Sequence, residues 1–464
     1  MIMITRRTIQ LFTWAFLLMP FAVMGENPGT PKKKKATESA VVTYFTENIA
    51  QDSIQTFACS QSIKAGQIRQ MQDKVWQWWK KANQQLKEEK LIPLKPLTEG
   101  GKGLWKLPAE KEPNAQMPYY WGSKGIRPEA GYPLFLYLHG SGPKDDEWYT
   151  GWKLAEMFED GPSVYFIPQI PNEGGYYRWW QKAKIYAWER LFRQALLTDS
   201  INPNRLYCFG ISEGGYGSQR LASYYADYLA AAGPMAGGEP LINAPVENCM
   251  NIGYSMLTGA QDYGFYRHIL TQNTKEAFDS LEQKYPGHYR HRIALIPGRG
   301  HGIDYRPTTP WLKDFVRTPQ PKSFIWENFE MDGIYRKGFY NLVVLERSNT
   351  KEGERTVYVM DIQGNRINLE VNNVSYEVTE KDPQWGIGLK YKKIYEPAHS
   401  GKFLLYLSPD LVNLDQEVTV YVNGEKAYEG KPQLRMEHLI NSCMVFTDPQ
   451  RLFPAAVTID LEKI

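Results

Sequence analysis

The sequence predicts an α/β fold with a mostly parallel central sheet over residues 65–318, followed by an all-β, sandwich-like region over residues 319–464. In the first region, short apolar runs alternate with amphipathic stretches, as parallel strands joined by helices do. At Thr318-Pro319-Gln320-Pro321 this alternation stops, and short β-type runs follow one another. The chain is therefore expected to hold an α/β domain and a β-rich domain.

The N-terminal residues are typical of an export signal. Arg6 and Arg7 precede an apolar stretch, Leu11 to Met24, that is shorter than the roughly 20 residues a membrane span requires. We expect residues 1–25 to be a cleaved signal peptide and residues 26–64 to be a leader and N-terminal extension. The protein is then expected in the periplasm or outside the cell, without stable membrane insertion.

The composition argues against several classes of partner. The 54 Lys and Arg nearly balance the 51 Asp and Glu, so no concentrated basic face for nucleic acid is expected. Four cysteines are few for an exported chain of 464 residues, and they lack the spacing of a metal site. We expect no disulfide framework, no metal and no cofactor.

The α/β region opens with an amphipathic helix, Ala65 to Lys90, whose tryptophans we interpret as core residues rather than a sugar platform. Leu104 to Pro108 and Met117 to Trp121 predict antiparallel strands. Leu134 to Leu138 predicts a parallel strand buried on both faces. It ends in His139-Gly140-Ser141-Gly142, where small residues let backbone N–H groups turn toward an oxyanion; a simple tight turn is the alternative. We expect the histidine to order this loop.

The next elements lead to a serine. Val164 to Pro168 predicts a strand and Ile185 to Ala195 a helix, before a further strand, Leu206 to Gly210. Gly-Ile-Ser-Glu-Gly then follows around Ser212, and a helix from Tyr216 follows the turn. A strand, a sharp glycine-flanked turn and a helix form a nucleophile elbow, which exposes the serine Oγ at the edge of a sheet.

Two further strands end in residues that could activate this serine. The run from Ile252 to Gly259 delivers Asp262, and the run from Arg292 to Pro297 delivers His301 between glycines. A serine hydroxyl becomes a good nucleophile when a neutral imidazole takes its proton, and the imidazole needs a carboxylate on its other nitrogen. The sequence therefore supplies a complete set in the order Ser, Asp, His.

This order, with each residue at a strand end, resembles that of the α/β-hydrolase superfamily. Within it, the chain is similar to secreted bacterial esterases and the prolyl-oligopeptidase-like branch, over roughly Leu104 to Arg317. The resemblance implies a catalytic triad of nucleophile Ser212, base His301 and orienting acid Asp262. It also implies that backbone N–H groups of Ser141 and Glu213 bind the oxyanion, with Gly142 as an alternative to Ser141.

Substrate contacts are predicted on loops at the strand ends, where open α/β sheets bind ligands. The candidates are Trp148, which follows the glycine-rich loop, and Arg178, Trp179 and Trp180, which follow the Val164 strand. Their flat rings would suit sugar faces, although packing between loops is an equal alternative. Four arginines could pair with an acidic group of a substrate, namely Arg178, Arg267, Arg299 and Arg306.

The β-rich region ends the chain. Asn423-Gly424 after Val418 to Val422 predicts a hairpin turn because both central positions need positive φ. We favour a structural buttress over a glycan-binding module for this region.

These observations predict a secreted serine hydrolase that cleaves acyl or methyl esters on a plant or other polysaccharide through an acyl-enzyme intermediate. The alternative is a prolyl-oligopeptidase-like serine peptidase, although no propeller domain is visible. A non-catalytic glycan-binding protein on the same fold is the third hypothesis. The sequence leaves the oligomeric state open.

Overall fold

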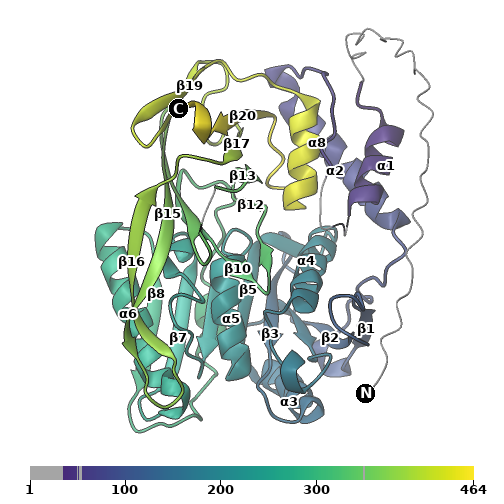
Figure 1. Cartoon of the computed structure of the whole chain (residues 1–464). Coiled ribbons are helices and arrows are strands. Elements are labelled where there is room, and N and C mark those ends of the chain that lie inside the picture. The colour runs from purple at the N-terminus through teal and green to yellow at the C-terminus, as the bar shows by residue number, and fades with distance from the viewer. Residues whose placement is uncertain (1–34, 50, 52–54, 349–350) are drawn as a thin grey trace, which may run out of the picture.

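The structure is a computed structural model and describes residues 35–49, 51, 55–348 and 351–464. The predicted signal peptide lies outside these residues. An eight-stranded sheet flanked by helices forms one end of the molecule, and the C-terminal sheets lie at the other end (Figure 1). Within the described residues, no helix combines the length and apolar character needed to cross a bilayer.

The central sheet has the order β1-β2-β4-β3-β5-β6-β7-β8. Only β1, β2 and β4 meet in antiparallel pairs, and every other neighbouring pair is parallel, which confirms the predicted fold class. The strands are β1 (Lys102–Lys106), β2 (Gln116–Lys124), β3 (Tyr132–Leu138), β4 (Ser163–Pro168), β5 (Ile201–Ile211), β6 (Ala231–Met235), β7 (Gly253–Gly259) and β8 (His291–Ile296).

Helices cover both faces of this sheet because its central strands are apolar on both sides. In β3, Leu134 and Leu136 pack on the face that carries α4 and α5, whereas Phe135 and Tyr137 pack on the face that carries α3 and α7. The helices are α3 (Lys144–Met157), α4 (Lys182–Leu196), α5 (Glu213–Tyr224), α6 (Arg267–Lys284) and α7 (Thr308–Leu312).

The C-terminal region contains two main sheets. One has four strands, β12 (Gly338–Phe339), β13 (Leu342–Glu346), β17 (Lys402–Leu407) and β20 (Ala455–Asp460). The other has six strands, β9 (Ser323–Asn328), β14 (Arg355–Gln363), β15 (Arg366–Lys381), β16 (Gly388–Pro397), β18 (Val418–Val422) and β19 (Glu425–Gly430). A two-stranded ribbon, β10 (Glu330–Met331) with β11 (Ile334–Tyr335), precedes them. The predicted turn is confirmed, with φ of 50° at Asn423 and 90° at Gly424.

This region is not all-β, because it includes α8 (Met436–Phe446). Apolar side chains at helical spacing, Met436, Leu439, Ile440 and Cys443, give this helix a buried face. That face packs against α1 (Glu38–Asn48) and α2 (Ile68–Gln85). In the same cluster Trp79 is fully buried, with its ring edge-on to Phe45 at 5.0 Å. The expectation that the tryptophans of this helix belong to the core holds for this residue.

Buried charges join the α/β region to the C-terminal region. The Asp227 carboxylate accepts hydrogen bonds from Arg336 and Arg451. The Asp448 carboxylate accepts from Arg451 and Arg317. Around this network, one apolar cluster combines Tyr254 and Phe278 of the α/β region with the inner faces of both C-terminal sheets.

Candidate active site

Ser212 lies at the sharp turn between β5 and α5, with φ of 56° and ψ of −114°. A non-glycine residue adopts such a positive φ rarely, and strain of this kind concentrates at functional sites. The neighbouring glycines make the turn possible: a Cβ on Gly214 would come within 1.9 Å of the Leu138 carbonyl oxygen, and one on Gly210 within 2.4 Å of the Gly214 carbonyl oxygen. The elbow is therefore a local consequence of the Gly-x-Ser-x-Gly sequence.

The three predicted triad residues meet at the carboxyl edge of the sheet. The distance from His301 Nε2 to Ser212 Oγ is 2.9 Å, and from His301 Nδ1 to Asp262 Oδ2 it is 2.7 Å. In the tautomer that satisfies both contacts, Nδ1–H donates to the carboxylate and Nε2 accepts from the serine hydroxyl. Asp262 is buried, whereas the His301 side chain is 46% exposed, so a substrate can reach the imidazole.

The fold is that of the α/β-hydrolases. The strand order of the central sheet and the elbow at Ser212 carry this assignment. No protein-family model matches the chain, and neither does any curated protein.

Solved structures that are similar to this chain include three that each match less than half of it. A thermostable esterase is 20% identical with a TM-score of 0.37, over 48% of this chain and 64% of that one. A CE1 ferulic acid esterase from Anaeromyces mucronatus is 16% identical with a TM-score of 0.34, over 47% of this chain and 89% of the esterase. A poly(3-hydroxybutyrate) depolymerase from Bordetella parapertussis is 14% identical with a TM-score of 0.34, over 44% and 86% of the two chains.

Arg267 also binds the Asp262 carboxylate. Its Nε donates to Asp262 Oδ2 at 2.8 Å, and its Nη2 donates to Oδ1 at 2.6 Å. Burial alone would raise the pKa of Asp262, but the hydrogen bonds from Arg267 and His301 outweigh it and lower the pKa. Arg267 was one of four arginines predicted as possible partners of an acidic substrate group, and its guanidinium is already paired with this buried carboxylate. Arg306 pairs with Asp304 at the surface.

No local sequence pattern indicates the contact between Arg267 and Asp262. Arg267 begins α6, five residues after the acid, and the turn between them brings the two side chains together. Only the three-dimensional path of that turn distinguishes this arginine from the others.

The glycine-rich loop after β3, residues 139–142, is fixed by Glu147. The Glu147 carboxylate accepts the Gly140 N–H at 3.1 Å and the Gly142 N–H at 3.2 Å. In the described part of the chain, the Ser141 N–H between them has no acceptor. This arrangement favours Ser141 over Gly142 as an oxyanion donor, because the Gly142 N–H is already used.

The second predicted donor is the Glu213 N–H. It lies at the first position of α5, where the backbone N–H groups of a helix have no intrahelical acceptor and attract negative charge. The Glu213 side chain is mostly buried, and burial raises its pKa to about 7, an effect that Arg178 partly offsets. The Arg178 guanidinium lies 3.5 Å from the Glu213 carboxylate and is itself 47% exposed.

His139 takes the structural role that its sequence context indicates. Its Nε2 accepts the Ile170 N–H at 3.1 Å, and its Nδ1 lies 2.8 Å from the Gly140 carbonyl oxygen. Burial lowers the pKa of His139 to about 4, so the ring is neutral at physiological pH. The histidine therefore ties the glycine-rich loop to the segment that follows β4.

Two of the four predicted substrate contacts are core residues. Trp179 is fully buried, and its Nε1 donates to the His139 carbonyl oxygen at 3.0 Å. Trp148 is 9% exposed and donates to the Ile167 carbonyl oxygen at 2.8 Å. Neither ring presents a face to a ligand, so these two predictions are corrected: the rings pack the loops together. Trp180 is partly exposed beneath the Arg220 guanidinium, which lies 4.0 Å from its ring centre.

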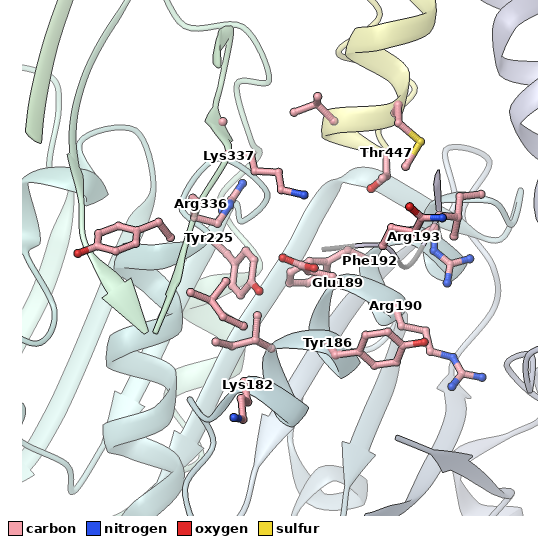
Figure 2. Close-up of a pocket in the computed structure, with 18 of the residues that line it drawn as sticks. Lys182, Tyr186, Glu189, Arg190, Phe192, Arg193, Tyr225, Arg336, Lys337 and Thr447 are labelled. Atoms are coloured by element: carbon pink, nitrogen blue, oxygen red, sulfur yellow. The ribbon is translucent and has the colours of Figure 1, made fainter. Parts of the chain in front are cut away.

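A cavity of about 760 Å³ lies apart from the triad (Figure 2). It is enclosed by α4, by the segment around Arg336 and by the end of α8, and no triad residue lines it. Figure 2 labels Lys182, Tyr186 and Glu189 of α4 among the residues that line this space. The cavity belongs to the junction of the α/β and C-terminal regions.

Proposed function

We propose that this protein is a serine hydrolase that cleaves carboxylic esters through an acyl-enzyme intermediate. One observation carries the proposal: Ser212, His301 and Asp262 form a continuous hydrogen-bonded chain with separations of 2.9 and 2.7 Å. Two backbone N–H groups are the proposed oxyanion donors: that of Glu213, which directly follows the nucleophile at the start of α5, and that of Ser141, which has no acceptor in the described residues.

In the first step, Ser212 Oγ attacks the ester carbonyl carbon while His301 Nε2 takes the hydroxyl proton. The carbonyl oxygen becomes negatively charged and accepts hydrogen bonds from the Ser141 and Glu213 N–H groups. His301 then gives its proton to the leaving alkoxide, which departs as an alcohol, and the acyl group stays on Ser212.

In the second step, His301 takes a proton from water, and the resulting nucleophile attacks the acyl carbon. Collapse of that intermediate releases the carboxylic acid and returns the proton to Ser212 Oγ. Asp262 stabilises the imidazolium in both steps. Its geometry does not depend on the histidine alone, because Arg267 holds both carboxylate oxygens.

For the substrate, we propose acyl or methyl esters on a plant or other polysaccharide, met in the periplasm or outside the cell. The expected export signal supports this location. Exposed aromatic residues at the edge of the sheet support a sugar substrate, including Tyr176, which is 41% exposed and follows β4 in the chain. Flat aromatic surfaces with nearby polar groups are typical of ligand sites for such molecules.

A fluorophosphonate probe tests the proposal because it reacts only with an activated serine. We expect labelling of the wild type and of Ser218→Ala, a buried serine six positions further along the chain, but none of Ser212→Ala. Absence of labelling in the wild type would contradict both the esterase hypothesis and the peptidase hypothesis. Assays with acetyl, methyl and feruloyl glycan esters beside Pro- and Ala-linked peptides then separate the esterase from the peptidase.

A further inference from the structure

The C-terminal region sends a long hairpin to the active-site edge of the central sheet. β15 is 16 residues long, and beyond Val374 it pairs only with β16 in the described part of the chain. Figure 1 shows these two strands running beside α6 to the end of the molecule that lies away from the other C-terminal strands. Asn273 of α6 anchors β16 by donating to the Leu389 carbonyl oxygen at 2.8 Å.

The hairpin tip, residues 382–387, is a fixed structure. The Asp382 carboxylate is buried and accepts the backbone N–H groups of Gln384 at 3.0 Å and Trp385 at 2.6 Å. It also accepts a hydrogen bond from the Tyr266 hydroxyl, which lowers the pKa of Asp382 against the opposing effect of burial. One carboxylate therefore fixes both the shape of the turn and its attachment to the α/β region.

This fixed tip presents an aromatic ring to solvent. Trp385 is 58% exposed, whereas the other tryptophans that the structure describes are buried or partly buried. Its nearest aromatic neighbour across the two regions is Phe265, which is 54% exposed with its ring centre 5.7 Å away. The rings are inclined by 48°, so each keeps a face available. Trp385 on the fixed turn and Phe265 on the loop after Asp262 thus form an exposed apolar patch, and such patches mark interaction sites.

The aromatic pair is coupled to the triad through a short, strained segment. Phe265 and Tyr266 follow Asp262 closely and have φ of 50° and 59°, values that side-chain-bearing residues adopt rarely. The Arg267 guanidinium lies 5.7 Å from the Phe265 ring centre and donates to the Asp262 carboxylate. The segment that holds the catalytic acid thus also holds one ring of the pair.

We propose that Trp385 and Phe265 form a binding subsite for a sugar ring of the ester substrate, supplied jointly by the C-terminal hairpin and the loop after Asp262. The inference rests on the proposed function, since it names how that site recognises a glycan. A pyranose ring offers an apolar C–H face to an aromatic ring and hydroxyl groups around its rim. Gln261, Tyr263 and Gln384 are exposed residues close to the pair in sequence, and their side chains can form hydrogen bonds with such hydroxyls.

Two of the charged groups around the subsite are already paired with other groups. Asp382 is committed to the backbone of its own turn, and Arg267 is committed to Asp262. A subsite of this kind would bind the polysaccharide chain while leaving the reaction at Ser212 unchanged for a small ester. The C-terminal region would then take part in substrate recognition.

Binding is measured in the Ser212→Ala background, so the result does not depend on catalysis. The assay is affinity electrophoresis through gels that contain acetylated xylan, acetylated glucomannan or methyl-esterified pectin. We expect retardation in at least one gel, about tenfold weaker apparent affinity for Trp385→Ala, and near-normal affinity for Trp385→Phe. Tyr395→Ala is the matched control, because that ring is 49% exposed on β16 but lies away from the tip.

Two results would overturn the subsite. One is equal retardation of all variants, or no retardation in any gel; fluorophosphonate labelling of Ser212 would still test the hydrolase separately. The other is measured with active enzyme. If the tip binds sugar, Trp385→Ala should leave kcat/KM for p-nitrophenyl acetate within about twofold of wild type. An equal loss on the small ester and on the glycan ester would show that the tip supports the Asp262 loop and does not bind sugar.

Discussion

Replacing Glu213 by Gln should make the stability of this protein less sensitive to pH. Glu213 follows the nucleophile, and its side chain is 12% exposed. Burial raises its pKa from 4.5 to about 7, Arg178 and Arg220 lower it, and Glu239 adds to the rise. Glutamine has the shape of the protonated acid but cannot ionise.

The sign follows from where each state binds the proton. Between pH 4.5 and about 7, the unfolded chain loses this proton while the folded protein keeps it, so stability falls as pH rises through this window. The stability that the protonated Glu213 side chain contributes is fully present below pH 4.5 and is lost above about pH 7. At about 1.4 kcal/mol per pH unit, the loss amounts to about 3 kcal/mol. Glu213→Gln should avoid it.

Urea unfolding of wild type and Glu213→Gln at pH 4.5, 6, 7 and about 8.5 measures this difference. We expect little difference at the acid end and a variant more stable by about 3 kcal/mol at the alkaline end. The exposed Glu425→Gln serves as the control and should show no such trend. A difference between wild type and Glu213→Gln that stays constant across this range would refute the reasoning. The variant should remain active, because the oxyanion donor at this position is the backbone N–H.

Three further outcomes follow from the described contacts. Asp262→Asn should lower kcat on p-nitrophenyl acetate by about 10⁴-fold with an unchanged circular dichroism spectrum, and a loss under tenfold would mean that another acid orients the histidine. Glu147→Ala removes the acceptor that fixes the loop of residues 139–142, so kcat should fall by about 10²-fold with little change in KM, and unchanged kcat would contradict this role. Arg451→Met leaves Asp227 and Asp448 buried with fewer donors, so the free energy of unfolding in urea should drop by about 3 kcal/mol or more; a drop below about 1 kcal/mol would argue against this network.

The features that the sequence predicted are those encoded by local rules. The elbow at Ser212 requires glycines on both sides, because a Cβ at those positions would clash with neighbouring backbone atoms. These glycines are visible within five consecutive residues of the sequence. Asp262 and His301 each follow an apolar strand, so parallel topology alone brings them to the same edge of the sheet. The mostly parallel sheet follows from the same apolar runs.

The features that the sequence missed depend on contacts between distant segments. Trp148 and Trp179 carry the same side chain as Trp385, yet two are buried and one is exposed, and no local pattern distinguishes them. The helix α8 was missed because short β-type runs surround it, although its apolar residues have helical spacing. The contact of the Glu147 carboxylate with the Gly140 and Gly142 N–H groups was also missed, because it depends on how α3 packs against the loop after β3.

The shared apolar cluster has a practical consequence for anyone who dissects this protein. Ending the chain after residue 318 would leave Tyr254 and Phe278 without the sheets that pack over them, and would strip α1 and α2 of their contact with α8. The shortened chain would expose a broad apolar surface and is expected to aggregate instead of yielding a minimal enzyme. Evolution could exchange such a region only together with the surface beneath it, so the two halves of the chain are expected to be inherited as one piece.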